Sequence, residues 1–230
     1  MQHLDPPPCD VLKEIWDTGR VQLPGGGSRP AVLGIGVKHA TALYHLVLRE
    51  KPDMVVETGM GQGVSTLSIL CALQQTGGRM ISIDPYPRWT RGREAALNAV
   101  QRAGYADRHR LIEEPSEIAL PRLVSEGLRI QFAYVDGNHD VEHAFLDFFY
   151  MDRLLREGGV MGFNNAGWRP VFQVIRHLKR TRPYKELTVG LQADYGARNP
   201  LLSLMRRLMR WPRQDRYFRK TVPGSRKTPG

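Results

Sequence analysis

Short apolar segments alternate with amphipathic segments along residues 54–182 of this 230-residue chain. Each apolar segment has the length of a buried strand, and each leads through a loop into residues with apolar side chains at helical spacing. Five strand–loop–helix repeats of this length build a parallel sheet with helices on both faces. We therefore predict an α/β fold with a doubly wound, Rossmann-like and mostly parallel sheet.

The individual elements can be placed from the same pattern. Strands are expected at residues 54–57, 79–83, 110–113, 130–135 and 160–163, and a final antiparallel pair at 185–189 and 191–193. Helices are expected at residues 11–16, 39–50, 64–74, 90–103, 116–126, 141–155 and 170–180. The sheet should therefore have about seven strands, the last pair antiparallel, with its ligand at the carboxyl ends of the parallel strands.

The positive charge of the chain lies mostly at its C-terminal end. The chain has 33 basic and 23 acidic side chains, of which residues 198–230 hold ten basic side chains and one acid, Asp215. This leaves 23 basic and 22 acidic side chains on residues 1–197. We divide the chain into an irregular N-terminal lead-in (1–34), a domain (35–197) and a basic tail (198–230). The near-neutral body argues against nucleic acid as the partner of the folded domain.

Residues 200–211 of this tail predict a short amphipathic helix, with Leu and Met on one stripe and Arg around the opposite side. Three interpretations stay open for it. The helix can dock on the domain or on a second subunit in a homo-oligomer, lie on an anionic membrane surface, or contact nucleic acid or another polyanion. Residues 212–230, rich in Pro, Gly, Arg and Lys, predict a flexible end.

The remaining composition favours a cytoplasmic protein, with the tail as its one route to a membrane. No segment has the roughly 20 apolar residues that a membrane-spanning helix needs. The N-terminus lacks the basic and apolar regions of a signal peptide. Cys9 and Cys71 are the two cysteines, and their spacing predicts neither a disulfide framework nor a structural zinc site.

A glycine-rich turn, Glu57-Thr58-Gly59-Met60-Gly61-Gln62-Gly63, follows the first strand of the predicted sheet. Glycine permits a tight turn and a close approach of the backbone to a ligand, and the helix N-terminus beyond offers unpaired N–H groups. The spacing differs from the dinucleotide fingerprint, and no Gly-Lys-Ser/Thr follows as in a P-loop. Asp84 ends the next strand, where a carboxylate can accept both hydroxyls of a ribose. An adenosine-type ligand is therefore expected here.

Three segments together resemble class I S-adenosylmethionine-dependent methyltransferases: VVETGMGQGVSTLSIL, ISIDPYP and AYVDGNHDVEHAFLDFFYMDRLLREGGVMGFNN. The resemblance covers residues 35–182 and is strongest to the small O-methyltransferases of the catechol, caffeoyl-CoA and sugar-modifying types. It implies S-adenosylmethionine as the cofactor. The cofactor-binding residues that it implies are Glu57 at the methionine amino group, Gly59, Gly61 and Gly63 along the loop, Ser65 at the helix start, Asp84 on the ribose, Ser116 beside the adenine, and Asp136.

A second polar group follows the fourth and fifth predicted strands. In the resembled enzymes two Asp and one Asn at these positions bind a divalent metal and a Lys is the general base, which implies Asp136, Asn164 and Asn165 as metal candidates and His139 as the base. Asn164 stands where those enzymes have an Asp, so one anionic ligand remains, which disfavours Mg²⁺. His139, with an ordinary pKa of about 6.5, can take a hydroxyl proton without a metal. Asp136 would orient or polarise it.

Other interpretations of these residues stay open. His139 can cap the following helix instead, Asp140 and His143 fit a solvated helix N-terminus, and Trp168 suits a pocket wall or the core. We predict an enzyme that methylates a hydroxyl group of a small-molecule or sugar-containing acceptor, with His139 and Asp136 as catalytic residues. The alternatives are an RNA methyltransferase that uses the basic tail and a non-catalytic cofactor-binding scaffold. The sequence does not specify the acceptor.

Overall fold

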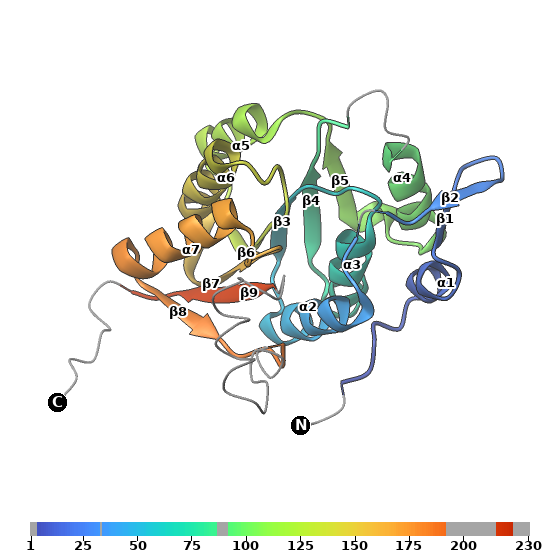
Figure 1. The fold of residues 1–230 in the computed structure, drawn as a ribbon, viewed down its shortest axis with the longest axis horizontal. Coiled ribbons are helices and arrows are strands. Elements are labelled where there is room, and N and C mark those ends of the chain that lie inside the picture. Colours follow the sequence, from blue (N-terminus) through green and yellow to red (C-terminus); the bar gives the residue numbers. More distant parts are fainter. Residues whose placement is uncertain (1–3, 33, 87–91, 192–214, 223–230) are drawn as a thin grey trace.

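Seven strands form one sheet at the centre of the molecule (Figure 1). They are β3 (Met54–Thr58), β4 (Arg79–Ile83), β5 (His109–Ile112), β6 (Ile130–Val135), β7 (Leu155–Phe163), β8 (Tyr184–Leu187) and β9 (Arg216–Lys220). The computed structural model describes residues 4–32, 34–86, 92–191 and 215–222. The strand order is β5-β4-β3-β6-β7-β9-β8, parallel from β5 to β7, with β9 antiparallel to both of its neighbours. The predicted fold class is confirmed.

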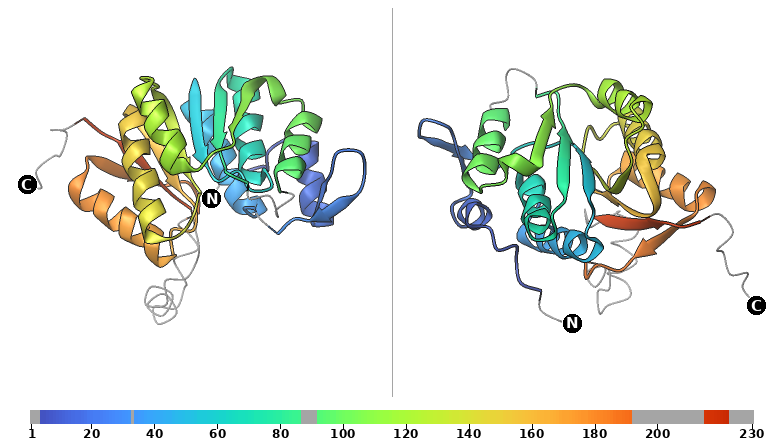
Figure 2. Two further views of the ribbon diagram at one scale, coloured as in Figure 1. Left: turned by 90° about the horizontal axis from the view of Figure 1, so that it is seen from above. Right: turned by 180° about the vertical axis from the view of Figure 1, so that it is seen from behind.

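Helices cover both faces of this sheet (Figures 1 and 2). One face carries α1 (Asp10–Thr18), α2 (Val37–Glu50), α3 (Val64–Thr76) and α4 (Gly92–Arg102), and the other carries α5 (Ser116–Ser125), α6 (Val141–Leu154) and α7 (Arg169–Thr181). A short 3₁₀ helix, η1 (Ala106–Arg108), leads into β5. Within the described ranges, no helix is long and apolar enough to cross a membrane.

Each face of the sheet contributes to its own hydrophobic core. Adjacent residues of a strand point to opposite faces, so Val55 and Tyr217 pack with α1–α4 while Val56 and Phe218 pack with α5–α7. All four side chains are fully buried. This burial on both faces explains why the central strands β3, β4 and β6 are largely apolar rather than alternating.

The last antiparallel pair of the described residues is β8 with β9, Tyr184 opposite Lys220. We predicted that residues 185–189 pair with 191–193, and residues 192–193 lie outside the described residues. Residues 216–220 thus belong to the sheet and not to a flexible tail, because β9 lies between β7 and β8 and fills both cores. The predicted amphipathic helix at 200–211 lies outside the described residues.

Three basic residues counted in the tail are neutralised by acids of the domain. Their side chains lie within ion-pair distance of carboxylates, and Arg216 makes two hydrogen bonds of 2.7 Å to one glutamate. The pairs are Arg216 with Glu186, Arg219 with Glu50, and Lys220 with Asp152. These three cations are already paired, so fewer basic side chains at this end of the chain can bind a polyanion than the net charge suggests.

The N-terminal segment, expected to be irregular apart from one short helix, is more ordered. Helix α1 is present, and a hairpin of β1 (Arg20–Gln22) and β2 (Ser28–Pro30) follows it. The carbonyl of Pro30 accepts a hydrogen bond of 2.9 Å from the Gln62 side chain. The hairpin is thereby tied to the glycine-rich turn after β3, so this segment helps to hold that turn.

Candidate active site

A cleft of about 980 Å³ opens at the carboxyl ends of β3, β4 and β6. It lies where the strand order reverses, since β4 and β6 flank β3 on opposite sides. Ligands of doubly wound sheets bind at this point, and the volume is at the upper end of the range for small-molecule sites. The cleft has room for a cofactor together with an acceptor.

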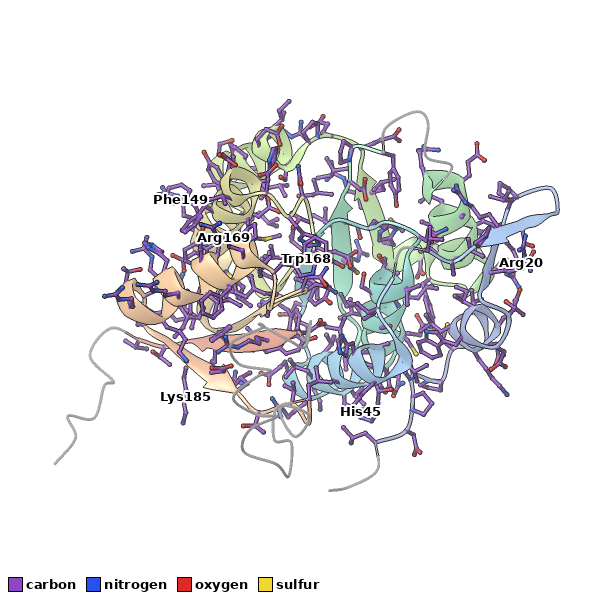
Figure 3. The ribbon with its side chains drawn as sticks, in the orientation of Figure 1. Arg20, His45, Phe149, Trp168, Arg169 and Lys185 are labelled. Atoms are coloured by element: carbon purple, nitrogen blue, oxygen red, sulfur yellow. The ribbon has the colours of Figure 1, made fainter. Side chains whose placement is uncertain are left out.

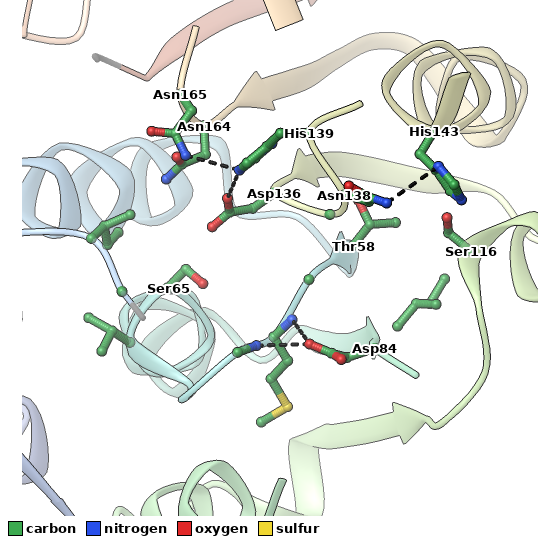
Figure 4. A pocket seen from close by; sticks show the side chains of 18 of the residues that line it. Thr58, Ser65, Asp84, Ser116, Asp136, Asn138, His139, His143, Asn164 and Asn165 are labelled. Atoms are coloured by element: carbon green, nitrogen blue, oxygen red, sulfur yellow. Dashed lines mark hydrogen bonds and ion pairs between the residues drawn. The ribbon is translucent and has the colours of Figure 1, made fainter. Parts of the chain in front are cut away.

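Most of the predicted site residues lie together on this cleft (Figure 4). They come from the segments that follow the five parallel strands β3 to β7, which end at one edge of the sheet. The predicted residues that line it are Gly59, Gly61, Ser65, Asp84, Ser116, Asp136, His139, Asn164 and Asn165. Glu57 and Gly63 are not among the lining residues.

The glycine-rich turn requires glycine at Gly59 for two reasons. Its φ of 81° lies in the left-handed region, and a Cβ there would overlap the backbone carbonyl of Asp136. The close contact joins the loop after β3 to the loop after β6. These two loops therefore form one rigid edge of the cleft.

Asp84 ties the glycine-rich turn to the end of β4 (Figure 4). Its Oδ2 accepts hydrogen bonds of 3.0 Å from the backbone N–H groups of Met60 and Gly61, and its Oδ1 accepts one of 2.9 Å from that of Tyr86. A carboxylate oxygen accepts up to two hydrogen bonds, so Oδ1 keeps acceptor capacity. Asp84 thus shapes the loop and presents a carboxylate to the cleft.

Glu57 lies beneath the turn and is fully buried. Its carboxylate accepts three hydroxyl hydrogen bonds, from Ser65 (2.6 Å), Thr66 (2.7 Å) and Ser82 (2.9 Å). Direct contact with a methionine amino group, as the resemblance implied, is not available in this geometry. Ser65 does line the cleft, and because its proton goes to Glu57, its oxygen lone pairs can accept from an ammonium group. Glu57 acts on the cleft through Ser65.

Burial raises the pKa of the Glu57 carboxyl to about 7, against the lowering effect of its hydroxyl partners. The folded protein therefore binds this proton more tightly than the unfolded chain does. The resulting stabilisation is fully present below pH 4.5 and is lost as the pH rises through about 7. The unfolding free energy of the wild type should therefore decrease between pH 4.5 and 8. In Glu57→Gln this decrease should be smaller by roughly 3 kcal/mol. Urea denaturation at several pH values measures both.

The control for this prediction is Glu126→Gln, the same change on an exposed side chain. It should leave the pH profile of the wild type in place. Some pH dependence should persist in Glu57→Gln, because burial also raises the pKa of Asp147 to about 6. Parallel profiles for Glu57→Gln and the wild type over the whole range would contradict the prediction.

His139 lies on the cleft beside Asp136 and Asn165 (Figure 4). Its Nε2 is 3.7 Å from Oδ1 of Asp136 and 3.0 Å from the Asn165 amide nitrogen, which donates to it. With an N–H donor at Nε2, the ring proton of neutral His139 belongs on Nδ1. Burial lowers the pKa of His139. The imidazole is therefore neutral at pH 7 and has the lone pair that a general base needs.

The competing interpretations of the neighbouring residues are resolved by contacts. The N-cap of α6 is Asp140 and not His139, since the Asp140 carboxylate accepts from the backbone N–H of His143 at 2.8 Å. Trp168 lines the cleft and packs edge-on against His139, with ring centroids 4.8 Å apart. Trp168 is thus a pocket wall.

Negative charge accumulates around Asp136. Burial raises the pKa of its carboxyl well above the usual range, and the charges of Asp215, Glu57 and Asp84 raise it further. The Asp136 side chain is still about one-fifth exposed, on the cleft side (21%). A cationic ligand would relieve this accumulation of carboxylates.

The metal candidates do not fit a divalent ion. Asp136 is the single carboxylate among them, and the amide nitrogens of Asn164 and Asn165 are directed to the Tyr134 hydroxyl and to His139. In the described part of the chain, no three His, Cys, Asp or Glu side chains gather as a metal site would need. Mg²⁺ prefers hard oxygen ligands, usually with carboxylates among them. We derive no step through a metal.

Sequence reasoning missed four residues that reach this site. Tyr134, Tyr217 and Asp215 form a buried hydrogen-bonded group behind Asn164, and His39 joins it from α2. One signal was present, because Asp215 is the single acid in a strongly basic segment. Its place beside the cleft depends on the pairing of β9, which sequence spacing does not show.

Fold and site together resemble those of class I methyltransferases. Residues 56–166, just under half of the chain, match the family model described as a methyltransferase domain. A segment of 119 residues, 52% of the chain, is 28% identical to an O-methyltransferase of Aspergillus hancockii. The aligned segment spans 45% of the length of that relative.

Two solved structures share the architecture. The methyltransferase PaMTH1 of Podospora anserina, bound to S-adenosylhomocysteine, has a TM-score of 0.68 and 17% identity, covering 93% of this chain and 88% of that chain. The O-methyltransferase TomG of Streptomyces achromogenes, involved in tomaymycin synthesis and in complex with S-adenosylmethionine, has a TM-score of 0.62 and 20% identity, covering 83% and 82%. At these identities the likeness establishes the fold.

Proposed function

We propose that this chain binds S-adenosylmethionine and transfers its methyl group to a hydroxyl group of a small-molecule or sugar-containing acceptor. The observation that carries this proposal is His139, a neutral imidazole at the cleft with Asp136 beside it. A hydroxyl acceptor needs a base more than an amine with its own lone pair does. The relative from Aspergillus hancockii, named an O-methyltransferase, supports the same reaction.

The cofactor fits the cleft residue by residue. Oδ1 of Asp84 accepts a hydrogen bond from a ribose hydroxyl, Ser116 at the start of α5 lies beside the adenine, and the Ser65 oxygen accepts from the methionine ammonium group. The carboxylates around Asp136 favour the two positive charges of S-adenosylmethionine. The bound cofactors of the two similar structures support this assignment.

The reaction is an in-line displacement at carbon. The acceptor hydroxyl replaces the Asn165 amide at Nε2 of His139 and gives up its proton there, while its oxygen attacks the methyl carbon. The carbon–sulfur bond breaks, and its electron pair stays on sulfur as the neutral thioether of S-adenosylhomocysteine. The proton leaves His139 to water. Positioning of donor and acceptor supplies most of the rate, and proton removal supplies the rest.

The test supplies tritiated S-adenosylmethionine and pairs of acceptors that differ in one group, a hydroxyl in one and an amine in the other. Phenols and methyl glycosides are the first compounds of the panel. We expect label in a methyl ether, identified by mass spectrometry, and faster transfer to the hydroxyl member of each pair. Transfer to the amine alone would overturn the proposal. Binding of S-adenosylhomocysteine without transfer to any acceptor would also overturn it, and would favour a non-catalytic scaffold.

RNA as the acceptor is the second candidate that the sequence left open. It rests on the basic tail, and in the described part of that tail Arg216, Arg219 and Lys220 are paired with acids. The structure therefore gives RNA less support than it gives a small molecule. Binding of RNA that weakens steeply with salt and is lost on deleting residues 223–230 would reverse this order.

A further inference from the structure

A buried carboxylate that the proposed reaction has not used lies behind the cleft. Asp215 directly precedes β9 and is 3% exposed. Its Oδ2 accepts hydrogen bonds from the hydroxyls of Tyr134 (2.6 Å) and Tyr217 (3.1 Å). Both tyrosines are fully buried in the sheet, so the carboxylate is held in one orientation from below.

The other oxygen of this carboxylate faces a histidine of the cleft. Oδ1 of Asp215 lies 3.3 Å from Nδ1 of His39, in the first turn of α2. The Asp215 side chain is 1% exposed, whereas that of His39 is 24% exposed and lines the cleft. Oδ1 has no hydrogen-bond partner among the described residues, and His39 Nδ1 lies within ion-pair distance of it. A buried acceptor without a partner favours the tautomer of the facing ring that carries its proton on Nδ1, which leaves the lone pair on Nε2. In this tautomer His39 offers the cleft a hydrogen-bond acceptor.

The pair belongs to the acceptor end of the cleft. Tyr134, which donates to Asp215, also accepts from the Asn164 side chain at 3.3 Å. Asn164 adjoins Asn165, the partner of His139. The charge of Asp215 also acts on Asp136. His39 is thus joined to the residues around the transferring methyl rather than to Asp84 and Ser116 at the adenosine end.

We propose that His39 is a substrate-contacting residue and that Asp215 is the positioning residue that holds it. Nε2 of His39 accepts a hydrogen bond from an N–H or O–H group of the methyl acceptor, which sets the attacking oxygen in line with the methyl carbon. His139 remains the base. The inference rests on the proposed function, and it adds a second histidine and the strand β9 to the acceptor site.

Kinetics of three variants test this, using whichever phenol or methyl glycoside the wild type methylates fastest. His39→Gln should lower kcat/KM for the acceptor by roughly 10- to 100-fold, because orientation of the acceptor is lost. Binding of S-adenosylhomocysteine, measured by calorimetry, should stay within about twofold. Asp215→Asn should act in the same direction. The double variant should be no worse than His39→Gln alone within about twofold, since Asp215 acts through His39.

The matched control is His45→Gln, further along the same helix (Figure 3), where the ring contacts the Asp5 carbonyl instead of the cleft. Its kinetics should equal those of the wild type. A His39→Gln variant with unchanged acceptor kinetics would overturn the proposal. So would weaker cofactor binding with normal acceptor kinetics, because His39 would then serve the methionine end of the cofactor.

A chemical probe tests the role of His39 independently of methyl transfer. If the protein methylates no hydroxyl, the proposed function is wrong, but this probe still shows whether His39 presents its nitrogen to the cleft. Diethyl pyrocarbonate acylates neutral imidazole at an accessible lone pair, and peptide mass spectrometry gives the rate at each histidine. We expect His39 to react, and several-fold more slowly in Asp215→Asn. An unreactive His39 in the wild-type protein would overturn the inference, because its nitrogen would not be available on the cleft.

Discussion

Asp84→Ala is expected to weaken binding of S-adenosylhomocysteine by about 100-fold in calorimetry. The remaining acceptor site on Oδ1 would lose a charge-assisted hydrogen bond from a ribose hydroxyl, worth about 1.5–3 kcal/mol, and 2.7 kcal/mol corresponds to a factor of about 100. The variant also loses the acceptor for the Met60 and Gly61 N–H groups, so the glycine-rich turn becomes less well held. Both effects reduce affinity.

These two effects can be separated. Adenosine and 2′,3′-dideoxyadenosine differ in the ribose hydroxyls, so Asp84→Ala should weaken only adenosine if the carboxylate binds the sugar directly. Equal weakening of both nucleosides in ligand-observed NMR would leave Asp84 with a loop-holding role alone. The control is Asp107→Ala, which removes an exposed carboxylate in η1 away from the cleft. This variant should bind S-adenosylhomocysteine with the affinity of the wild type. Retained affinity in Asp84→Ala would refute the predicted ribose contact.

The parallel part of the fold was predictable because local pattern and tertiary structure agree there. The limits of β4 and β6 match the expected 79–83 and 130–135. The start of β7 does not, since the strand was expected to begin at residue 160 and begins at Leu155. Gly158 has a φ of 79° and the register of β7 shifts against β6, so the strand continues through the glycines as an irregularity. A glycine pair thus marks either a turn or a bulge.

The cofactor end of the cleft was largely predictable for a related reason. Gly59 and Asp84 directly follow strands, and parallel strands bring their carboxyl ends to one edge. Glu57 is the exception, because burial depends on the neighbours of a side chain. Ser65, Thr66 and Ser82 enclose its carboxylate completely. Its position in the motif gave no sign of this.

The acceptor end was less predictable because it depends on a long-range pairing. His39 and Asp215 are 176 positions apart in the sequence, and they meet only because β9 inserts beside β7. The composition of residues 198–230 pointed instead to a solvated tail, since basic residues are usually exposed. Pairing of Arg216 with Glu186 offsets the cost of placing that charge on an interior strand of the sheet.

The chemical step gives the other large effect. His139→Gln should lower kcat by about 100-fold or more, the usual contribution of a general base, while binding of S-adenosylhomocysteine stays within about threefold of the wild type. Glutamine keeps a polar group near Asn165 and Trp168 but cannot take up the hydroxyl proton.

The pH profile shows whether the loss is chemical. Because burial lowers the pKa of His139, the wild type should keep its activity to mildly acidic pH and lose it as His139 becomes protonated. That acidic limb should be absent from the residual activity of His139→Gln. His177→Gln, on α7 with its ring between Phe145 and Phe148, changes a histidine outside the cleft and should retain wild-type kcat and pH profile. A His139→Gln variant with wild-type kcat would remove the base from the mechanism, and proton transfer would then fall to Asp136 or directly to water.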